Sequence, residues 1–237
     1  MMTPNEAHEH RPKTAGGKIG RCSCQWGSAR CCGLVMPIVR TRIKAMSNAH
    51  KIILSLCDYT GIWCDPYKIA GYTVKQIDLK HGHDVRLLEY PGQVYGILAA
   101  PECTMFAASG ARWERTPEQM KEALAVVDAC LRCVAVCKPK FWALENPVGK
   151  LRRWLGQPRF YFNPCDYGDP YTKKTCLWGD FVPPLPLFVG KDLSVEPEKV
   201  CSQGSWIQKL GGKSERTKEA RSKTPVGFAQ AFFAVNQ

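Results

Sequence analysis

The sequence has no apolar run of about eighteen residues, the length that a helix needs to cross a bilayer. No apolar segment follows its charged start, as a secretory signal would require. It also lacks internal repeats. These absences exclude a membrane-spanning chain and a repeat array, and we expect a cytoplasmic protein. Acidic residues are few, 21 against 33 lysines and arginines, so the net charge is +12 and favours a polyanionic partner.

A regular cysteine framework is missing as well. The thirteen cysteines are scattered, and several, such as Cys57 and Cys130, fall inside apolar segments. This pattern is typical of reduced thiols in a reducing compartment rather than of disulfides. The cysteines nearest the amino terminus are Cys22, Cys24, Cys31 and Cys32. Their spacing does not match that of zinc sites, and we expect no metal.

The length of 237 residues suits one α/β domain. Residues 1–45 show no sustained apolar periodicity, so we expect a disordered basic extension. The first fifty residues hold eight basic and two acidic side chains, half of the net positive charge. Because Met46 directly precedes the first predicted strand, the domain is expected to span 46–237. Within it, the Pro-, Lys- and Ser-rich segment 180–223 is predicted to be a short irregular insertion.

Apolar runs bounded by turn residues predict six strands. They are Lys51–Cys57, Tyr72–Leu79, Val94–Leu98, Phe141–Pro147, Phe160–Asn163 and Thr175–Trp178. Helices are predicted at Pro66–Ala70, from Thr116 onward, where Gln119 completes a capping box, and at Pro225–Val235. Alternating strands and helices favour an α/β fold with a mostly parallel sheet flanked by helices.

The stretch Val94–Arg115 carries the most informative side chains. Its strand ends in a small-residue loop that contains Cys103, and the strand over Phe141–Pro147 ends at Glu145 and Asn146. Since the carboxyl ends of neighbouring parallel strands lie side by side, a thiol and a carboxylate are expected to share one crevice. Taken alone, Cys103 is more typical of an inert core cysteine than of a reactive one.

In this order, the motifs resemble those of the C5-cytosine DNA methyltransferases over roughly residues 50–235. Leu54–Gly61 is similar to the family's first motif, the turn that wraps S-adenosylmethionine. Pro101-Glu102-Cys103 stands where the family has its Pro-Pro-Cys or Ser-Pro-Cys nucleophile loop. Leu144–Pro147 matches the Glu-Asn-Val motif, and Thr224–Ala229 is similar to the closing motif.

The resemblance implies a role for each matching residue. It makes Cys103 the nucleophile, Glu145 the group that holds ring N3 of the base, and Lys173 the surviving cation of a Gln-x-Arg-x-Arg motif. The residues expected at the S-adenosylmethionine site are Asp58, Tyr59, Thr60, Gly61, Asp78, Asp84, Val85 and Pro101. The residues expected to contact nucleic acid are Arg112, Asn146, Arg152, Arg153 and Lys174. For Arg152 and Arg153, a solvated helix face would have the same basic pattern.

The chemistry explains why these residue types belong together. Cytosine C5 becomes nucleophilic only after a group has added to C6, and a thiolate both attacks and leaves readily. The resemblance therefore implies a Rossmann-like DNA (cytosine-5) methyltransferase that uses S-adenosylmethionine and forms a Cys103 adduct on a flipped or unpaired cytosine. Lys173 or Arg112 is expected to lower the pKa of Cys103.

Two alternatives stay open. Glu102 replaces the proline before Cys103, and the basic motif retains one cation, which favours a weakly active or non-catalytic nucleic-acid-binding member. An RNA cytosine methyltransferase is the other alternative, because one branch of the family acts on RNA. DNA is thus the expected partner and RNA its rival, with a monomer as the default assembly.

Overall fold

The structure is a computed structural model that describes residues 48–108, 114–186, 203–210 and 214–237. These residues lie within one compact unit, Pro37–Gln237. A six-stranded sheet with the order β2-β1-β3-β4-β6-β5 runs through it. The strands are β1 (Ile52–Leu56), β2 (Thr73–Ile77), β3 (Gly96–Ala99), β4 (Phe141–Pro147), β5 (Phe160–Phe162) and β6 (Thr175–Asp180). The predicted strands are therefore present, with ends shifted by at most two residues.

The sheet is mixed but mostly parallel, as predicted. β1 pairs in parallel with β2 and β3, and β3 pairs in parallel with β4. β6 is antiparallel to both of its neighbours, β4 and β5. The chain leaves β1 first toward β2 and then returns to its other side as β3, so the strand order reverses there. In open α/β sheets such a reversal leaves a crevice at the carboxyl ends of the strands, where ligands bind.

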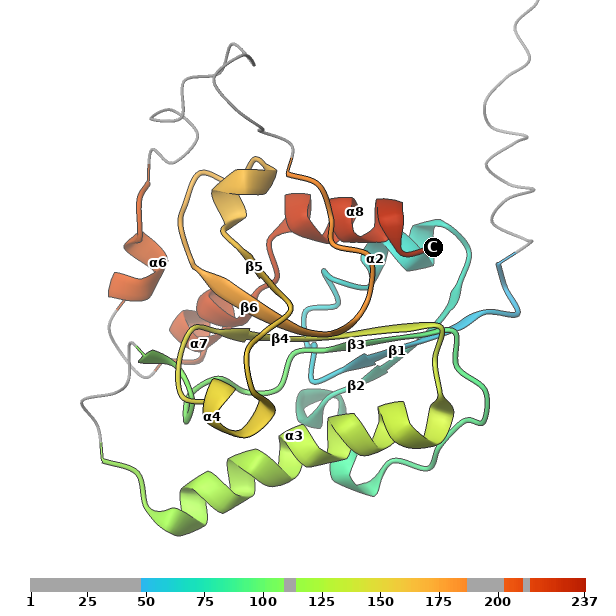
Figure 1. The fold of residues 1–237 in the computed structure, drawn as a ribbon, viewed down its shortest axis with the longest axis horizontal. Helices are drawn as coiled ribbons and strands as arrows, with labels where there is room; N and C mark the ends of the chain where they lie inside the picture. The colour runs from blue at the N-terminus through green and yellow to red at the C-terminus, as the bar shows by residue number, and fades with distance from the viewer. Residues whose placement is uncertain (1–47, 109–113, 187–202, 211–213) are drawn as a thin grey trace, which may run out of the picture. The chain divides into compact units, whose positions relative to one another are not determined.

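Helices cover both faces of the sheet (Figure 1). The helices are α2 (Asp65–Ile69), α3 (Pro117–Cys137), α4 (Arg152–Leu155), α6 (Trp206–Lys209), α7 (Glu215–Ser222) and α8 (Val226–Val235). Three short 3-10 turns are η1 (Leu79–His81), η2 (Val85–Leu87) and η4 (Pro164–Tyr167). α3 lies against one face, and α2 and α8 lie against the other. Among the described residues, no helix combines the length and apolar character that a membrane crossing needs.

Each face has its own apolar core. Under α3, Val127, Cys130 and Cys133 pack with Leu54 and Ile97 of the sheet. The opposite face carries an aromatic core between the sheet, α2 and α8, made largely of Trp63, Tyr67, Tyr167, Phe228 and Phe232. In this core the rings of Phe162 and Phe228 stack with centroids 3.7 Å apart. Burial of these side chains stabilises the strand register that places the carboxyl ends of the parallel strands at one edge of the sheet.

The predicted start of α3 is confirmed. Thr116 Oγ1 accepts a hydrogen bond from Gln119 N at 3.2 Å, and Gln119 Oε1 accepts one from Thr116 N at 3.1 Å. This reciprocal capping box satisfies two backbone donors at the helix start. The thiols that α3 carries into the core, Cys130, Cys133 and Cys137, are buried and free.

The segment 180–223 differs from the predicted irregular insertion, because it contains α6 and α7. Ser214 Oγ caps α7 by accepting from Thr217 N at 3.2 Å. Glu215 and Lys218 form an ion pair of 2.8 Å along it. α7 buries no side chain, so the apolar periodicity that signals a helix in the sequence is missing. Residues 187–202, 211–213 and the predicted extension 1–45 lie outside the described residues.

Candidate functional site

The register of the sheet brings the two predicted loops to the same edge. Ala99, the last residue of β3, pairs with Leu144 of the parallel strand β4. Cys103 lies in the loop that follows Ala99, and Glu145 directly follows Leu144. Both residues are therefore at the carboxyl ends of the parallel strands. In the antiparallel pair, Pro147 of β4 faces Thr175 of β6, so Lys173 lies just beyond the same edge.

The nucleophile loop is fixed by hydrogen bonds to its backbone. The Cys103 carbonyl accepts from the backbone N–H groups of Phe106 and Ala107 at 2.9 and 2.8 Å. Arg115 Nη2 donates to the Thr104 carbonyl at 2.8 Å. These contacts arrange the residues after Cys103 as a turn, which limits the positions open to the thiol.

Asn146 differs from its expected role as a nucleic-acid contact. Its side chain is only 1% exposed, and its Nδ2 donates to the carbonyl of buried Pro101 at 2.9 Å. It therefore ties the end of β4 to the loop that carries Cys103. Pro101 also belongs to this anchor, since its ring is buried. Within the described residues, Asn146 Oδ1 is buried without a hydrogen-bond partner.

The loops after β3 and β4 approach each other closely at Gly149. Ala107 and Gly149 form an isolated antiparallel bridge, and Lys150 N donates to the Phe106 carbonyl at 2.7 Å. A Cβ atom on Gly149 would lie 1.9 Å from the Phe106 oxygen. Only glycine therefore allows the two backbones to meet without a shift.

Gly149→Ala is expected to displace the nucleophile loop. Overpacking of this kind costs about 1–3 kcal/mol of folding free energy. The Tm should fall by several degrees, since a change of that size shifts the Tm of a domain of this length measurably. Thermal melts monitored by circular dichroism measure this, with Lys150→Ala as the control because it keeps the backbone contact. A Gly149→Ala protein with an unchanged Tm would contradict the close approach.

Opposing effects act on the thiol of Cys103. Burial raises its pKa, and the negative charges of Glu145 and Glu102 act in the same direction. The positive charges of Lys173 and Arg221 lower it but do not compensate for burial. Lys173 therefore lowers the pKa of Cys103 as predicted, but the net shift is upward because desolvation is the largest effect. The other cation expected to lower it, Arg112, lies outside the described residues.

Glu145 and Lys173 form a buried pair beside this thiol. They are 6% and 7% exposed, and Lys173 Nζ lies 3.9 Å from Glu145 Oε1. Lys173 Nζ also donates to the Arg221 carbonyl at 2.9 Å. Burial raises the pKa of Glu145, although the charge of Lys173 lowers it. The carboxyl group thus keeps a proton to higher pH than an exposed glutamate does.

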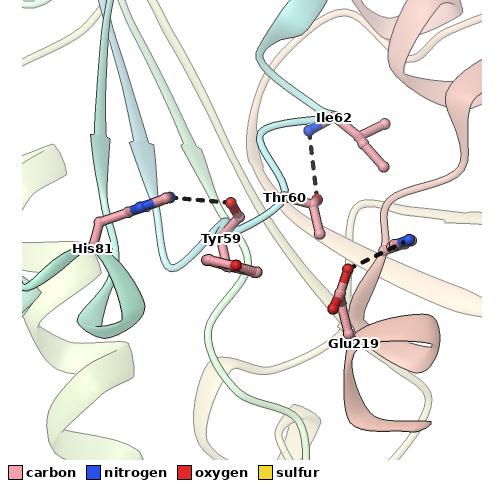
Figure 2. Close-up of a pocket in the computed structure, with 6 residues that line it drawn as sticks. Tyr59, Thr60, Ile62, His81 and Glu219 are labelled. Atoms are coloured by element: carbon pink, nitrogen blue, oxygen red, sulfur yellow. Dashed lines mark hydrogen bonds and ion pairs between the residues drawn. The ribbon is translucent and has the colours of Figure 1, made fainter. Parts of the chain in front are cut away.

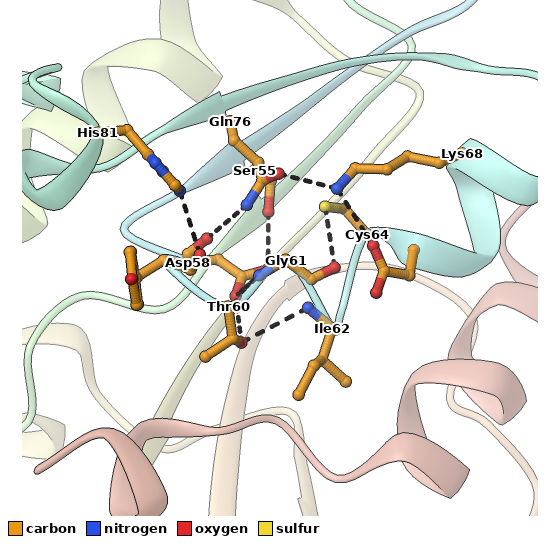
Figure 3. Close-up of polar contacts among 11 residues, drawn as sticks. Ser55, Asp58, Thr60, Gly61, Ile62, Cys64, Lys68, Gln76 and His81 are labelled. Carbon is orange, nitrogen blue, oxygen red and sulfur yellow. Dashed lines mark hydrogen bonds and ion pairs between the residues drawn. The ribbon is translucent and has the colours of Figure 1, made fainter. Parts of the chain in front are cut away.

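The loop after β1 is preorganised by Asp58 (Figure 3). Its carboxylate accepts hydrogen bonds from Gly61 N at 2.9 Å, Ser55 Oγ at 3.0 Å and Thr60 Oγ1 at 3.1 Å. Gln76 Nε2 donates to the Asp58 carbonyl at 2.9 Å. Gly61 has a φ of +70°, which favours glycine. Asp58 therefore points into its own loop and shapes it, and burial raises its pKa.

A cavity of about 330 Å³ adjoins this loop. It is lined by Tyr59, Thr60, Ile62, His81, Glu219 and Lys223. Figure 2 shows Glu219 on α7 across from Tyr59 and Thr60 of the loop. Two of the residues expected at the cofactor site thus meet a helix that the sequence did not predict.

The other residues expected at the cofactor site lie at the ends of neighbouring elements. Asp78 follows β2, and its Oδ1 caps η1 by accepting from Lys80 N at 2.8 Å. Asp84 caps η2 and pairs with Arg86 at 2.7 Å. Val85 is buried in the core under α3, so its side chain supports the fold. Asp78 and Asp84 lie on either side of His81 in the sequence, and neither is among the residues that line the cavity.

Of the cations expected at the nucleic acid, Arg152, Arg153 and Lys174 belong to the described residues and lie on the surface. Arg152 and Arg153 are exposed on α4, which follows the end of β4. Lys174 is exposed, and its Nζ lies 5.2 Å from the centre of the Tyr161 ring. Arg152 and Arg153 thus follow β4, which carries Glu145, whereas Lys174 lies between Lys173 and the start of β6.

Sequence reasoning missed the contributions of Arg115, Arg221, Glu219 and Lys223. Arg115 ends the stretch around Cys103, but nothing in its sequence indicates that it binds the Thr104 carbonyl. The other three belong to α7 or to its end, and the bond between Lys173 and Arg221 spans 48 residues. The charge pairs of α7 at i,i+3 and i,i+4 were the signal that could have indicated the helix.

Comparisons with known proteins show a partial likeness to solved structures. No protein-family model and no curated protein matches the sequence. A solved structure described as a candidate DNA modification methyltransferase, encoded within an E. coli prophage, matches at a TM-score of 0.39 and 16% identity. The match covers 55% of this chain and 46% of that one, less than half of its length. A likeness of this extent carries no conclusion about activity.

Proposed function

We propose that this protein is a DNA cytosine-5 methyltransferase that uses S-adenosylmethionine. The observation that carries the proposal is the convergence of a thiol, a buried carboxyl group and a buried ammonium group at one sheet edge. Cys103, Glu145 and Lys173 come from three separate segments, yet their charges act on one another. The motifs of the sequence assign these three residue types to one reaction.

The reaction begins at Cys103. Its thiolate adds to C6 of cytosine, the π electrons of the C5=C6 bond form a C4=C5 double bond, and the π electrons of the C4=N3 bond move onto N3. Glu145, which burial keeps protonated to higher pH, donates a hydrogen bond or its proton to N3 as negative charge develops there. Lys173 balances the charge of the pair and is held for this by the Arg221 carbonyl.

The residues around the cavity fit S-adenosylmethionine. The volume of the cavity, about 330 Å³, is at the small end of the range for sites that bind small molecules. The loop after β1 is already ordered by Asp58, and Asp78 follows the neighbouring strand. When bound, this cofactor supplies the methyl group that C5 accepts. Loss of the C5 proton to a base, departure of the Cys103 thiolate and return of any N3 proton to Glu145 then restore the aromatic ring.

A nucleic acid is the substrate that the surface charge favours. Arg152, Arg153 and Lys174 are exposed next to the site and are suited to phosphate contacts. A cytosine stacked in a duplex cannot reach a buried carboxyl group such as Glu145. The target base therefore has to be flipped out or unpaired.

A second function is favoured by one observation. Burial raises the pKa of Cys103, so the ligand-free thiol is less reactive than a free cysteine at neutral pH. This favours a weakly active or non-catalytic nucleic-acid-binding protein of the same fold. RNA as the substrate is the remaining alternative, because single-stranded RNA needs no duplex opening.

A transfer assay separates these functions. The protein is incubated with tritiated S-adenosylmethionine and with DNA or RNA of the same sequence, and the labelled base is identified after hydrolysis. The proposal predicts 5-methylcytosine in DNA. Label in RNA alone would support the RNA alternative, and binding of DNA without label would support the non-catalytic one.

We also expect weak sequence preference. The described part of 180–223 presents the short helices α6 and α7, of which α7 already forms the wall of the cavity. Readout of several bases needs a rigid element with several side chains in the major groove. Phosphate contacts hold DNA without distinguishing sequences, so affinity should fall steeply with salt. Bisulfite sequencing of a methylated plasmid measures this, and a defined motif of four or more base pairs would contradict it.

A further inference from the structure

α7 lies between the two halves of the candidate site, although it contributes nothing to the apolar core. Its first turn is tied to η1 by an ion pair between Glu215 Oε2 and Lys80 Nζ at 3.4 Å. Its last turn supplies the Arg221 carbonyl that accepts from Lys173 at 2.9 Å. These polar contacts hold α7 between the loop after β2 and the buried pair at the nucleophile. One face of the helix is thereby turned to the cavity.

That face carries two opposite charges. Glu219 and Lys223, one helical turn apart, both line the cavity, and Figure 2 shows Glu219 across from Tyr59 and Thr60. Lys223 Nζ lies 3.5 Å from Glu219 Oε1, and the two side chains are 48% and 40% exposed. An exposed i,i+4 pair of this kind contributes little to stability. It can therefore open for a ligand at small cost.

The charges indicate the chemical class of the ligand. A carboxylate and an ammonium group side by side match a zwitterion, whose ammonium donates to Glu219 and whose carboxylate accepts from Lys223. A phosphate group would be attracted by Lys223 but repelled by Glu219. Since Thr60 and the backbone of its loop form the opposite wall, the zwitterion would be held close to the loop that the sequence assigns to the cofactor.

We propose that the Glu219–Lys223 pair of α7 binds the α-amino-acid end of the methyl donor. The inference rests on the proposed function, because it takes S-adenosylmethionine as the ligand of the cavity. It assigns the amino-acid end to a helix outside the sequence motifs of the cofactor site. The nucleoside part then extends away from α7, toward the ends of β1 and β2.

Isothermal titration calorimetry on the full chain tests this with two ligands. S-adenosylhomocysteine retains the amino-acid end, and 5′-methylthioadenosine lacks it. Glu219→Gln and Lys223→Met should each weaken S-adenosylhomocysteine binding about tenfold, the size expected for one charge-assisted hydrogen bond at a partly exposed site. The Kd of 5′-methylthioadenosine should stay unchanged. Arg216→Met, at an exposed position of α7 outside the cavity lining, is the matched control and should change neither Kd.

A charge swap separates recognition from helix stability. The double variant Glu219→Lys, Lys223→Glu keeps an opposite-charge pair along α7 but exchanges the positions of the charges. Its affinity for S-adenosylhomocysteine should therefore stay below that of the native protein. Native affinity in Glu219→Gln and Lys223→Met would overturn the inference and leave the proposed function standing. An equal loss for both ligands would also overturn it, because the pair would then act on the whole cavity. If the native protein binds neither S-adenosylhomocysteine nor S-adenosylmethionine, the proposed function itself fails.

Discussion

Cys103→Ser is expected to abolish methyl transfer, with a loss of at least about a thousandfold, because a serine hydroxyl is a far weaker nucleophile than a thiolate at neutral pH. The loop after β1 is held by Asp58 and is separate from the nucleophile loop. S-adenosylhomocysteine should therefore bind the variant with nearly native affinity. Tritium transfer to DNA measures the first effect, and calorimetry measures the second.

Cys137→Ala is the control for this experiment. Cys137 is also a buried free thiol, but it ends α3 and precedes the amino end of β4, whereas Glu145 lies toward the carboxyl end of that strand. Its replacement should leave transfer within a few-fold of the native rate. A Cys103→Ser protein that methylates DNA at the native rate would exclude the covalent mechanism.

Glu145→Gln should lower the rate of transfer by about a hundredfold to ten-thousandfold, the usual contribution of general acid–base catalysis. Glutamine keeps the size of the side chain but cannot give a proton to N3. Lys173 retains its hydrogen bond to the Arg221 carbonyl, so the fold around it should persist. Single-turnover transfer rates measure the loss, and an unchanged Tm shows that the protein is intact.

The pH profile of this variant gives a second measurement. Activity that needs the thiolate of Cys103 rises with pH through the pKa of the thiol, which burial raises. Activity that needs protonated Glu145 falls as pH rises through the pKa of the carboxyl group, which burial also raises. The native profile should be bell-shaped. The residual activity of Glu145→Gln should follow the thiol alone and rise with pH; a bell-shaped profile in the variant would exclude Glu145 as the titrating acid.

The sequence predicted the elements that are specified locally. Apolar runs located the strands, and Thr116 with Gln119 located the start of α3, because these signals lie within a few residues of the structure they form. The pairing of the Cys103 and Glu145 loops could also be predicted. It follows from parallel strand order, which places their carboxyl ends at one edge.

The parts of the fold and of the site that the sequence did not predict depend on contacts between distant segments. α7 is polar on all sides, and its place is set by Lys80 and by Lys173, neither of which is near it in the sequence. The burial of Asn146 follows from the approach of the Pro101 loop, which no local pattern records. The pKa of Cys103 was predicted from the sign of a nearby charge, but desolvation depends on all the atoms packed around it.

Trapping with 5-fluorocytosine tests the central claim most directly. A fluorine at C5 cannot leave as a proton does, so a Cys103 adduct that has accepted the methyl group cannot release the enzyme. With S-adenosylmethionine and an oligonucleotide that contains 5-fluorocytosine, the native protein should form a covalent complex stable to denaturation. Peptide mapping should place the DNA on Cys103, and Cys103→Ser should form no complex. Methyl transfer to ordinary cytosine without a trapped complex, or a complex on another cysteine, would contradict this account.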